Sequence, residues 1–93
     1  MKFLAMCSTG LGSSFMVRMN IETIVGELGL SAVTVEHSDI SSAGPDSADV
    51  FFVAKDLEDA VQGLGDVVVL NSIIDMDELR EAVKAAAARH GLL

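Results

Sequence analysis

The chain has 93 residues, of which 14 are acidic and 6 are basic, giving a formal net charge of −8. Proteins that bind nucleic acid neutralise its phosphates with Lys and Arg, so this composition argues against nucleic acid as a partner. The length predicts one domain over residues 1–93, because it supports one hydrophobic core and leaves no room for a second.

Cysteine content and hydropathy indicate the cellular compartment and whether the chain enters a membrane. The single cysteine, Cys7, cannot form an internal disulfide, which favours a reducing, cytoplasmic compartment. The apolar run at residues 3–7 is shorter than the core of a signal peptide, and those at residues 50–54 and 67–70 are far shorter than a membrane-spanning helix. The sequence therefore predicts a soluble protein with no direct insertion into a membrane.

The pattern along the chain alternates between short apolar runs and segments with helical periodicity. In chain order it predicts a strand at residues 3–6, a helix from residue 13 or 14 to about 28, a strand at 32–36, a loop at 40–47, a strand at 50–54, a short helix or turn at 56–64, a strand at 66–70, a connection at 71–74 and a last helix from residue 75. Buried strands that alternate with helices indicate a parallel sheet with right-handed crossovers. The predicted fold is a three-layer α/β/α sandwich around a four-stranded parallel sheet.

Both longer helices carry recognisable end signals. Ser13 or Ser14 can cap the first helix, and Gly29 is a natural stop for it. Asp75 and Glu78 are spaced as a capping box at the start of the last helix. The apolar face of the first helix consists of Val17, Ile21, Ile24, Val25 and Leu28, and that of the last helix of Met76, Leu79, Ala82, Val83 and Ala86. Arg89, His90 and Gly91 suit the carboxyl end of the last helix.

Cys7 falls at the carboxyl end of the first predicted strand, where open α/β sheets place their ligand sites. The residues that follow it, "STGLGSS", lead into the first helix. Their glycines allow a tight turn whose N–H groups converge on an anion, and the helix start and four hydroxyl groups add further donors. Such a loop suits a phosphate group and lowers the pKa of a thiol beside it. Cys7 is therefore the predicted nucleophile, and the predicted phosphate-binding residues are Ser8, Thr9, Gly10, Leu11, Gly12, Ser13 and Ser14.

Other phosphate-binding motifs do not fit these residues. A Walker A loop requires a lysine that is missing between Lys2 and Lys55, and Phe15 stands where a dinucleotide-binding loop has its third glycine. A tyrosine phosphatase has an arginine six residues after its cysteine, but Ser13 occupies that position and Arg18 lies farther along the predicted helix. Without an arginine to stabilise attack by water, the loop favours a carrier of phosphate over a hydrolase.

Several further residues leave alternatives open. His37 and Asp39 at the end of the second predicted strand permit a Cys–His–Asp hydrolase. Two separate histidines and one cysteine form no metal-ligand cluster, so no metal is predicted. Phe15, Met16 and Met19 are either core residues or an apolar rim for a partner.

The motif C-x-x-G-x-G-S-S at residues 7–14 resembles the signature of the IIB components of the bacterial phosphoenolpyruvate-dependent sugar phosphotransferase system. It is most similar to the ascorbate type, with the galactitol and mannitol types close to it. The resemblance implies a sheet order of 2-1-3-4, a P-loop after the first strand and a cytoplasmic phosphocarrier without a cofactor. Cys7 would accept the phosphoryl group from a phosphohistidine of the IIA protein and pass it to a sugar, L-ascorbate, bound by the membrane permease IIC. The alternative is a hydrolase similar to low-molecular-weight cysteine phosphatases or arsenate reductases.

Overall fold

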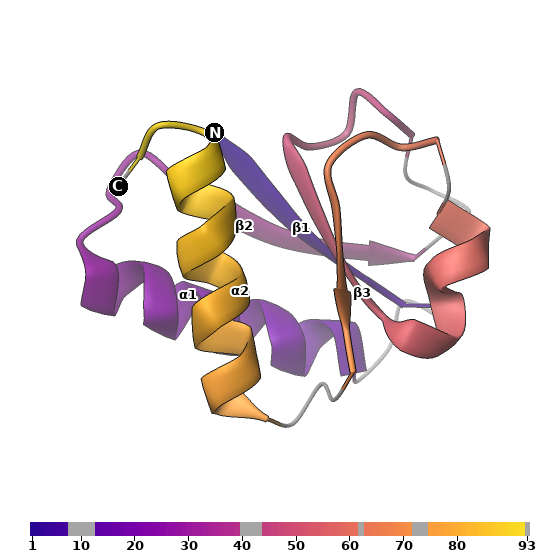
Figure 1. Cartoon of the computed structure of the whole chain (residues 1–93), viewed down its shortest axis with the longest axis horizontal. Coiled ribbons are helices and arrows are strands. Elements are labelled where there is room, and N and C mark those ends of the chain that lie inside the picture. Colours follow the sequence, from indigo (N-terminus) through magenta and orange to yellow (C-terminus); the bar gives the residue numbers. More distant parts are fainter. Residues whose placement is uncertain (8–12, 40–43, 62, 72–74, 93) are drawn as a thin grey trace.

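The computed structural model describes residues 1–7, 13–39, 44–61, 63–71 and 75–92. Its elements follow one another in alternating order, as the sequence predicts (Figure 1). They are β1 (Lys2–Cys7), α1 (Ser13–Leu28), β2 (Thr34–Asp39), β3 (Val50–Ala54), the 3₁₀ helix η2 (Lys55–Val61), β4 (Val67–Leu70) and α2 (Met76–Arg89).

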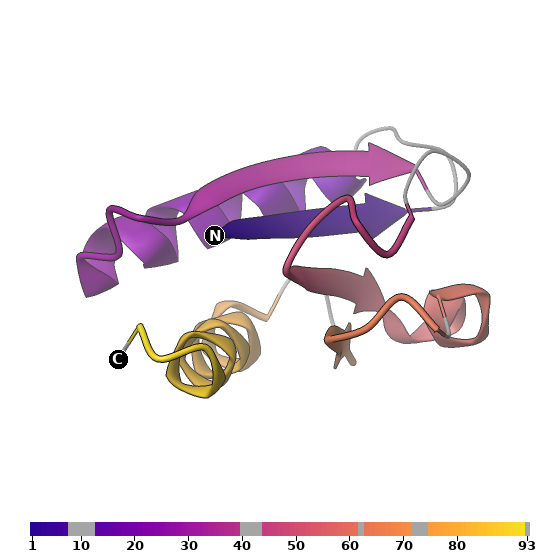
Figure 2. The same ribbon diagram turned by 90° about the horizontal axis from the view of Figure 1, so that it is seen from above.

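The four strands form one parallel sheet in the order β2-β1-β3-β4, so the predicted order is confirmed. The arrowheads of β1, β2 and β3 all point to the same side of the molecule (Figure 2). β1 lies between β2 and β3, and its register pairs Cys7 with Asp39 on one side and Met6 with Val53 on the other. The first strand of the sequence is therefore a central strand of the sheet.

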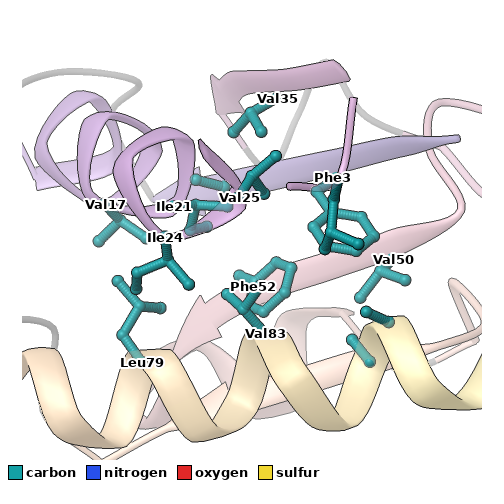
Figure 3. Close-up of a cluster of buried hydrophobic side chains, with 14 of the residues drawn as sticks. Phe3, Val17, Ile21, Ile24, Val25, Val35, Val50, Phe52, Leu79 and Val83 are labelled. Carbon is teal, nitrogen blue, oxygen red and sulfur yellow. The ribbon is translucent and has the colours of Figure 1, made fainter. Parts of the chain in front are cut away.

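The two faces of the sheet are covered by different elements. On one face, α1 and α2 pack against a cluster that includes Phe3, Val35 and Phe52 (Figure 3). On the other face, Val61 of η2 packs against a smaller cluster: Leu4, Met6, Phe51 and Val53. The helices, the sheet and η2 thus make the three layers of the predicted sandwich, with a short 3₁₀ helix as the thinnest layer.

The two helices bury the faces that their sequences predict. In α1, Val17, Ile21, Ile24 and Val25 are buried, and the helix ends before Gly29, whose φ of 72° is a left-handed value that favours glycine. In α2 the buried residues are Leu79, Val83, Ala86 and Ala87, while Met76 and Ala82 pack at the margin of the core. The apolar periodicity of the sequence is therefore sufficient to orient both helices.

The predicted cap at the start of α2 is present at Asp75. Asp75 is the N-cap residue, and its Oδ1 accepts hydrogen bonds from the backbone N–H of Asp77 at 3.0 Å and of Glu78 at 3.1 Å. The Glu78 carboxylate, the other half of the box, accepts from the backbone N–H and side-chain amide of Asn71. Glu78 therefore joins the start of α2 to the end of β4.

The main difference from the sequence prediction is the position of β2. The alternating pattern predicts a strand at residues 32–36, but β2 runs from Thr34 to Asp39 because it pairs residue for residue with β1. The polar residues Glu36, His37 and Ser38 are tolerated because β2 is an edge strand. Smaller differences are that the predicted element at residues 56–64 is a 3₁₀ helix at Lys55–Val61, and that β4 starts at Val67 instead of residue 66.

An ionic cluster joins the carboxyl end of α2 to the amino end of β4. Asp66 Oδ1 lies 2.9 Å from Arg89 Nη2, and Asp66 Oδ2 lies 2.8 Å from His90 Nε2. Partial burial opposes ionisation of Asp66, but the hydrogen bonds from Arg89 and His90 and their positive charges outweigh it and hold the pKa of the carboxyl below its usual value. The cluster lies at the end of the sheet opposite to Cys7.

We expect replacement of this carboxylate, Asp66→Asn, to lower the free energy of unfolding by roughly 0.5–1.5 kcal/mol at neutral pH. Because the folded-state pKa of Asp66 is lowered, its stabilising effect is fully present above the unfolded-state pKa, about 3.9, and is lost as the pH falls through the folded value. Urea unfolding of both proteins should therefore show a difference that shrinks below about pH 4. Asp46→Asn, which neutralises an exposed carboxyl, is the control, and a difference that widens toward acid would contradict the assignment.

Candidate functional site

The strand order places Cys7 at the point where the chain reverses its direction across the sheet. From β1 the chain passes through α1 to β2 on one side, and from β3 it passes through η2 to β4 on the other. The carboxyl ends of β1 and β3 lie at this switch point, which is where open α/β sheets bind their ligands. Cys7 is the last residue of β1. Its backbone therefore lies at the carboxyl edge of the sheet, as the sequence predicts.

The amino end of α1 lies at the same edge. The helix starts at Ser13, and its amino-terminal end is on the side to which the strand arrowheads point (Figure 2). The first N–H groups of a helix have no partner within it and carry a partial positive charge, so this end favours an anion. Ser13 and Ser14 are in the first turn, whereas the predicted loop residues 8–12 lie outside the described residues. The phosphate-binding loop stays a prediction.

Three side chains from α1 and β2 meet beside this edge. The rings of Phe15 and His37 are in edge-to-face contact, with centroids 5.5 Å apart. Arg18 Nη1 lies 3.3 Å from His37 Nδ1, and Arg18 Nε lies 3.0 Å from Glu22 Oε1 without the alignment of a hydrogen bond. The sequence does not reveal this cluster, because the contacts depend on the register that brings His37 against α1.

The Arg18 contact occupies one ring nitrogen of His37. A guanidinium has only N–H donors, so in this contact His37 Nδ1 is placed to accept a hydrogen bond from Arg18. In a Cys–His–Asp triad, Nδ1 donates to the carboxylate instead. In this structure, Arg18 lies at the ring nitrogen of His37 that faces the carboxylate in such a triad.

Comparison with protein families gives a match to the family described as the PTS system lactose/cellobiose specific IIB subunit, over residues 2–85. The match starts within β1, includes Cys7 and ends within α2. The chain belongs to this family. No curated protein gives a significant match. The predicted IIB identity is confirmed, whereas the family description names lactose and cellobiose and not ascorbate.

Within this IIB chain, the structure brings together two parts of the predicted site and leaves the third undescribed. The end of β1 with Cys7 and the first turn of α1 with Ser13 and Ser14 converge at one edge. Arg18 lies in the second turn of α1, bound to His37 and Glu22, so it occupies a different place from the arginine of a phosphatase loop. This arrangement agrees with a site that holds a phosphoryl group without the arginine of a phosphatase loop. Ser13 stands at that arginine's position, six residues after Cys7.

A groove between described residues of the IIB chain lies elsewhere. It has a volume of about 370 Å³ and is lined by the carboxyl-terminal half of α1 and the start of β2, including Gly26, Leu30 and Val35. None of the predicted site residues lines it. Among the described residues, three or more His, Cys, Asp or Glu side chains do not gather as metal ligands, and no described helix is long and apolar enough to cross a bilayer.

Proposed function

We propose that this IIB chain is the cytoplasmic phosphocarrier subunit of a sugar phosphotransferase system, with Cys7 as the residue that carries the phosphoryl group. The observation that carries the proposal is the position of Cys7 at the carboxyl end of central strand β1, directly before the chain turns into α1. The family match over residues 2–85 supports it, because it includes both elements. In this proposal, Ser8, Thr9, Gly10, Leu11, Gly12, Ser13 and Ser14 surround the phosphoryl oxygens.

The proposed reaction is an exchange of one bond for another. The Cys7 thiolate attacks the phosphorus of a phosphohistidine on the IIA protein in line with the P–N bond. The new S–P bond forms as the P–N bond breaks, and the imidazole nitrogen leaves with the electron pair and takes up a proton. Backbone N–H groups and the start of α1 stabilise the negative charge of the phosphoryl oxygens, which is the main requirement of such a transfer. A second transfer then moves the group to a sugar held by the membrane permease IIC.

For the sugar, we propose L-ascorbate, on the resemblance of residues 7–14 to the ascorbate-type loop. The matched family is described by lactose and cellobiose, so these sugars are the alternatives. Because the sugar is held by IIC, the partner proteins and not the IIB chain alone decide between them.

The test is to offer the purified chain to a panel of IIA proteins of the ascorbate, galactitol, mannitol and lactose/cellobiose types. Each IIA is charged with phosphoenolpyruvate, enzyme I and the histidine carrier. We expect one of them to add about 80 Da, a single phosphoryl group, to Cys7. The ascorbate-type IIA is expected to react fastest, and a faster lactose/cellobiose-type IIA would overturn the sugar assignment. Absence of any adduct, together with hydrolysis of small phosphate esters, would replace the carrier with the phosphatase-like alternative.

A further inference from the structure

The outer surface of α1 changes character along its length. Phe15, Met16 and Met19 in its first two turns are 46%, 49% and 51% exposed. Farther along the same helix, the exposed positions are polar or small: Glu22, Thr23, Gly26 and Glu27. The buried face is supplied separately by Val17, Ile21, Ile24 and Val25, so packing of the core does not require the three exposed apolar residues. We define Phe15, Met16 and Met19 as the α1 patch.

The α1 patch lies at the end of the helix that borders the proposed site. This half of α1 is on the side to which the strand arrowheads point, where Cys7 ends β1 (Figure 2). Phe15 is held there by its contact with His37 of β2. Met16 and Met19 are flexible and polarisable side chains, which suit a surface that must fit another protein and then release it.

The size and charge of the α1 patch limit the kinds of partner that can bind to it. Three side chains that are each about half exposed present on the order of 300 Å² of apolar surface, in the range of functional patches on monomers. A stable dimer of two copies buries about 800 Å² on each partner, so the patch alone falls well short of that requirement. The basic side chain of the same helix segment, Arg18, is paired with Glu22, and the whole chain carries a charge of −8, which disfavours contact with an anionic membrane surface. A soluble protein that binds transiently fits these properties best.

We propose that the α1 patch is the docking surface for the protein that donates the phosphoryl group, the IIA carrier of phosphohistidine. This inference rests on the proposed function, because transfer to Cys7 requires the donor imidazole to reach the carboxyl end of β1. A donor that reaches this point must cover the neighbouring surface, and the first two turns of α1 border it. The apolar contact positions the donor, and the reacting groups supply the chemistry.

The kinetic test uses the IIA protein that charges the wild-type chain fastest in the panel above. We expect Met19→Glu to raise the donor concentration for half-maximal charging at least about tenfold, with the maximal charging rate changed by less than about twofold. Ala85→Glu, which adds the same charge at an exposed position of α2, is the matched control and should behave as the wild type. Circular dichroism and the thermal midpoint verify that both variants fold.

A second test does not depend on any substitution. The chain has five methionines, Met1, Met6, Met16, Met19 and Met76, so ¹³C-methyl labelling of methionine reports on several faces at once. Addition of the same IIA protein with its phosphorylated histidine replaced by alanine should shift the signals of Met16 and Met19. The signals of Met1 and Met76, which lie outside α1, should stay unchanged.

The outcomes separate the two proposals. If the wild type is charged but Met19→Glu is charged equally well and the Met16 and Met19 signals do not move, the docking surface is wrong and the phosphocarrier function stands. If no IIA charges the wild type, both proposals fall. Signals of Met16 and Met19 that shift with the concentration of the chain alone would identify a self-association surface instead. Normal charging by IIA combined with loss of sugar phosphorylation would assign the α1 patch to IIC and overturn the proposal.

Discussion

We expect Cys7→Ser to reduce phosphoryl acceptance from charged IIA by at least about 1000-fold, because a serine hydroxyl is almost entirely protonated at neutral pH and is a far weaker nucleophile than a thiolate. The measurement is intact mass spectrometry after incubation with charged IIA. Ala54→Ser adds a hydroxyl at the same edge of the sheet, at the end of β3, and should accept the phosphoryl group at the wild-type rate.

Two controls distinguish loss of the nucleophile from loss of the fold. Cys7→Ser should unfold in urea as cooperatively as the wild type. Alkylation of the wild-type protein should also block labelling, since Cys7 is the only thiol in the chain. Unimpaired labelling of the alkylated protein or of Cys7→Ser would show that another residue accepts the phosphoryl group. Collapse of Cys7→Ser would indicate instead that the cysteine serves packing.

The second large effect concerns the core. Phe52 is 1% exposed, and its ring lies 5.4 Å from that of Phe3 between the sheet and the helices (Figure 3). We expect Phe52→Ala to lower the free energy of unfolding by about 3–5 kcal/mol, because it removes buried apolar surface and leaves a cavity. A domain of this length has a total stability of about 5–14 kcal/mol, so the variant should lose a large part of it. Urea unfolding followed by circular dichroism measures the difference.

Phe15→Ala is the matched control, because it removes the same ring from an exposed position on α1. It should cost less than about 1 kcal/mol, since the ring keeps nearly half of its surface in water. A similar loss from both variants would show that Phe15 belongs to the core. A small loss from Phe52→Ala would mean that the cluster between the sheet and the two helices is not the main source of stability.

The fold was predictable from the sequence wherever burial dominates the pattern. β3, with four fully buried residues, was predicted to the residue, and both long helices were predicted from their apolar spacing. The predicted bounds of β2 were wrong because its second half, Glu36 to Asp39, is polar and carries no periodic signal of a strand. Its pairing with β1 determines where it lies, and a register across two strands is a tertiary property that local patterns do not encode.

The candidate site was predictable in position but not in its surroundings. An apolar run that ends at Cys7, followed by glycine and hydroxyl residues, is sufficient to place the cysteine at the end of a strand before a helix. The contact of His37 with Arg18 was not predictable, because the two residues lie on different elements. Nor does the sequence separate a core methionine from an exposed one: Met6 is buried, whereas Met16 and Met19 lie on the surface.

The central place of β1 determines how much the proposed acceptor can move. Its backbone is hydrogen-bonded to β2 on one flank and to β3 on the other, up to its last residues. An edge strand would be free to bend or fray when a heavily charged group arrives, whereas a strand clamped on both sides keeps its end fixed. Most of the entropy that must be lost to align the acceptor with the phosphoryl group is therefore lost during folding, before IIA and the IIB chain meet.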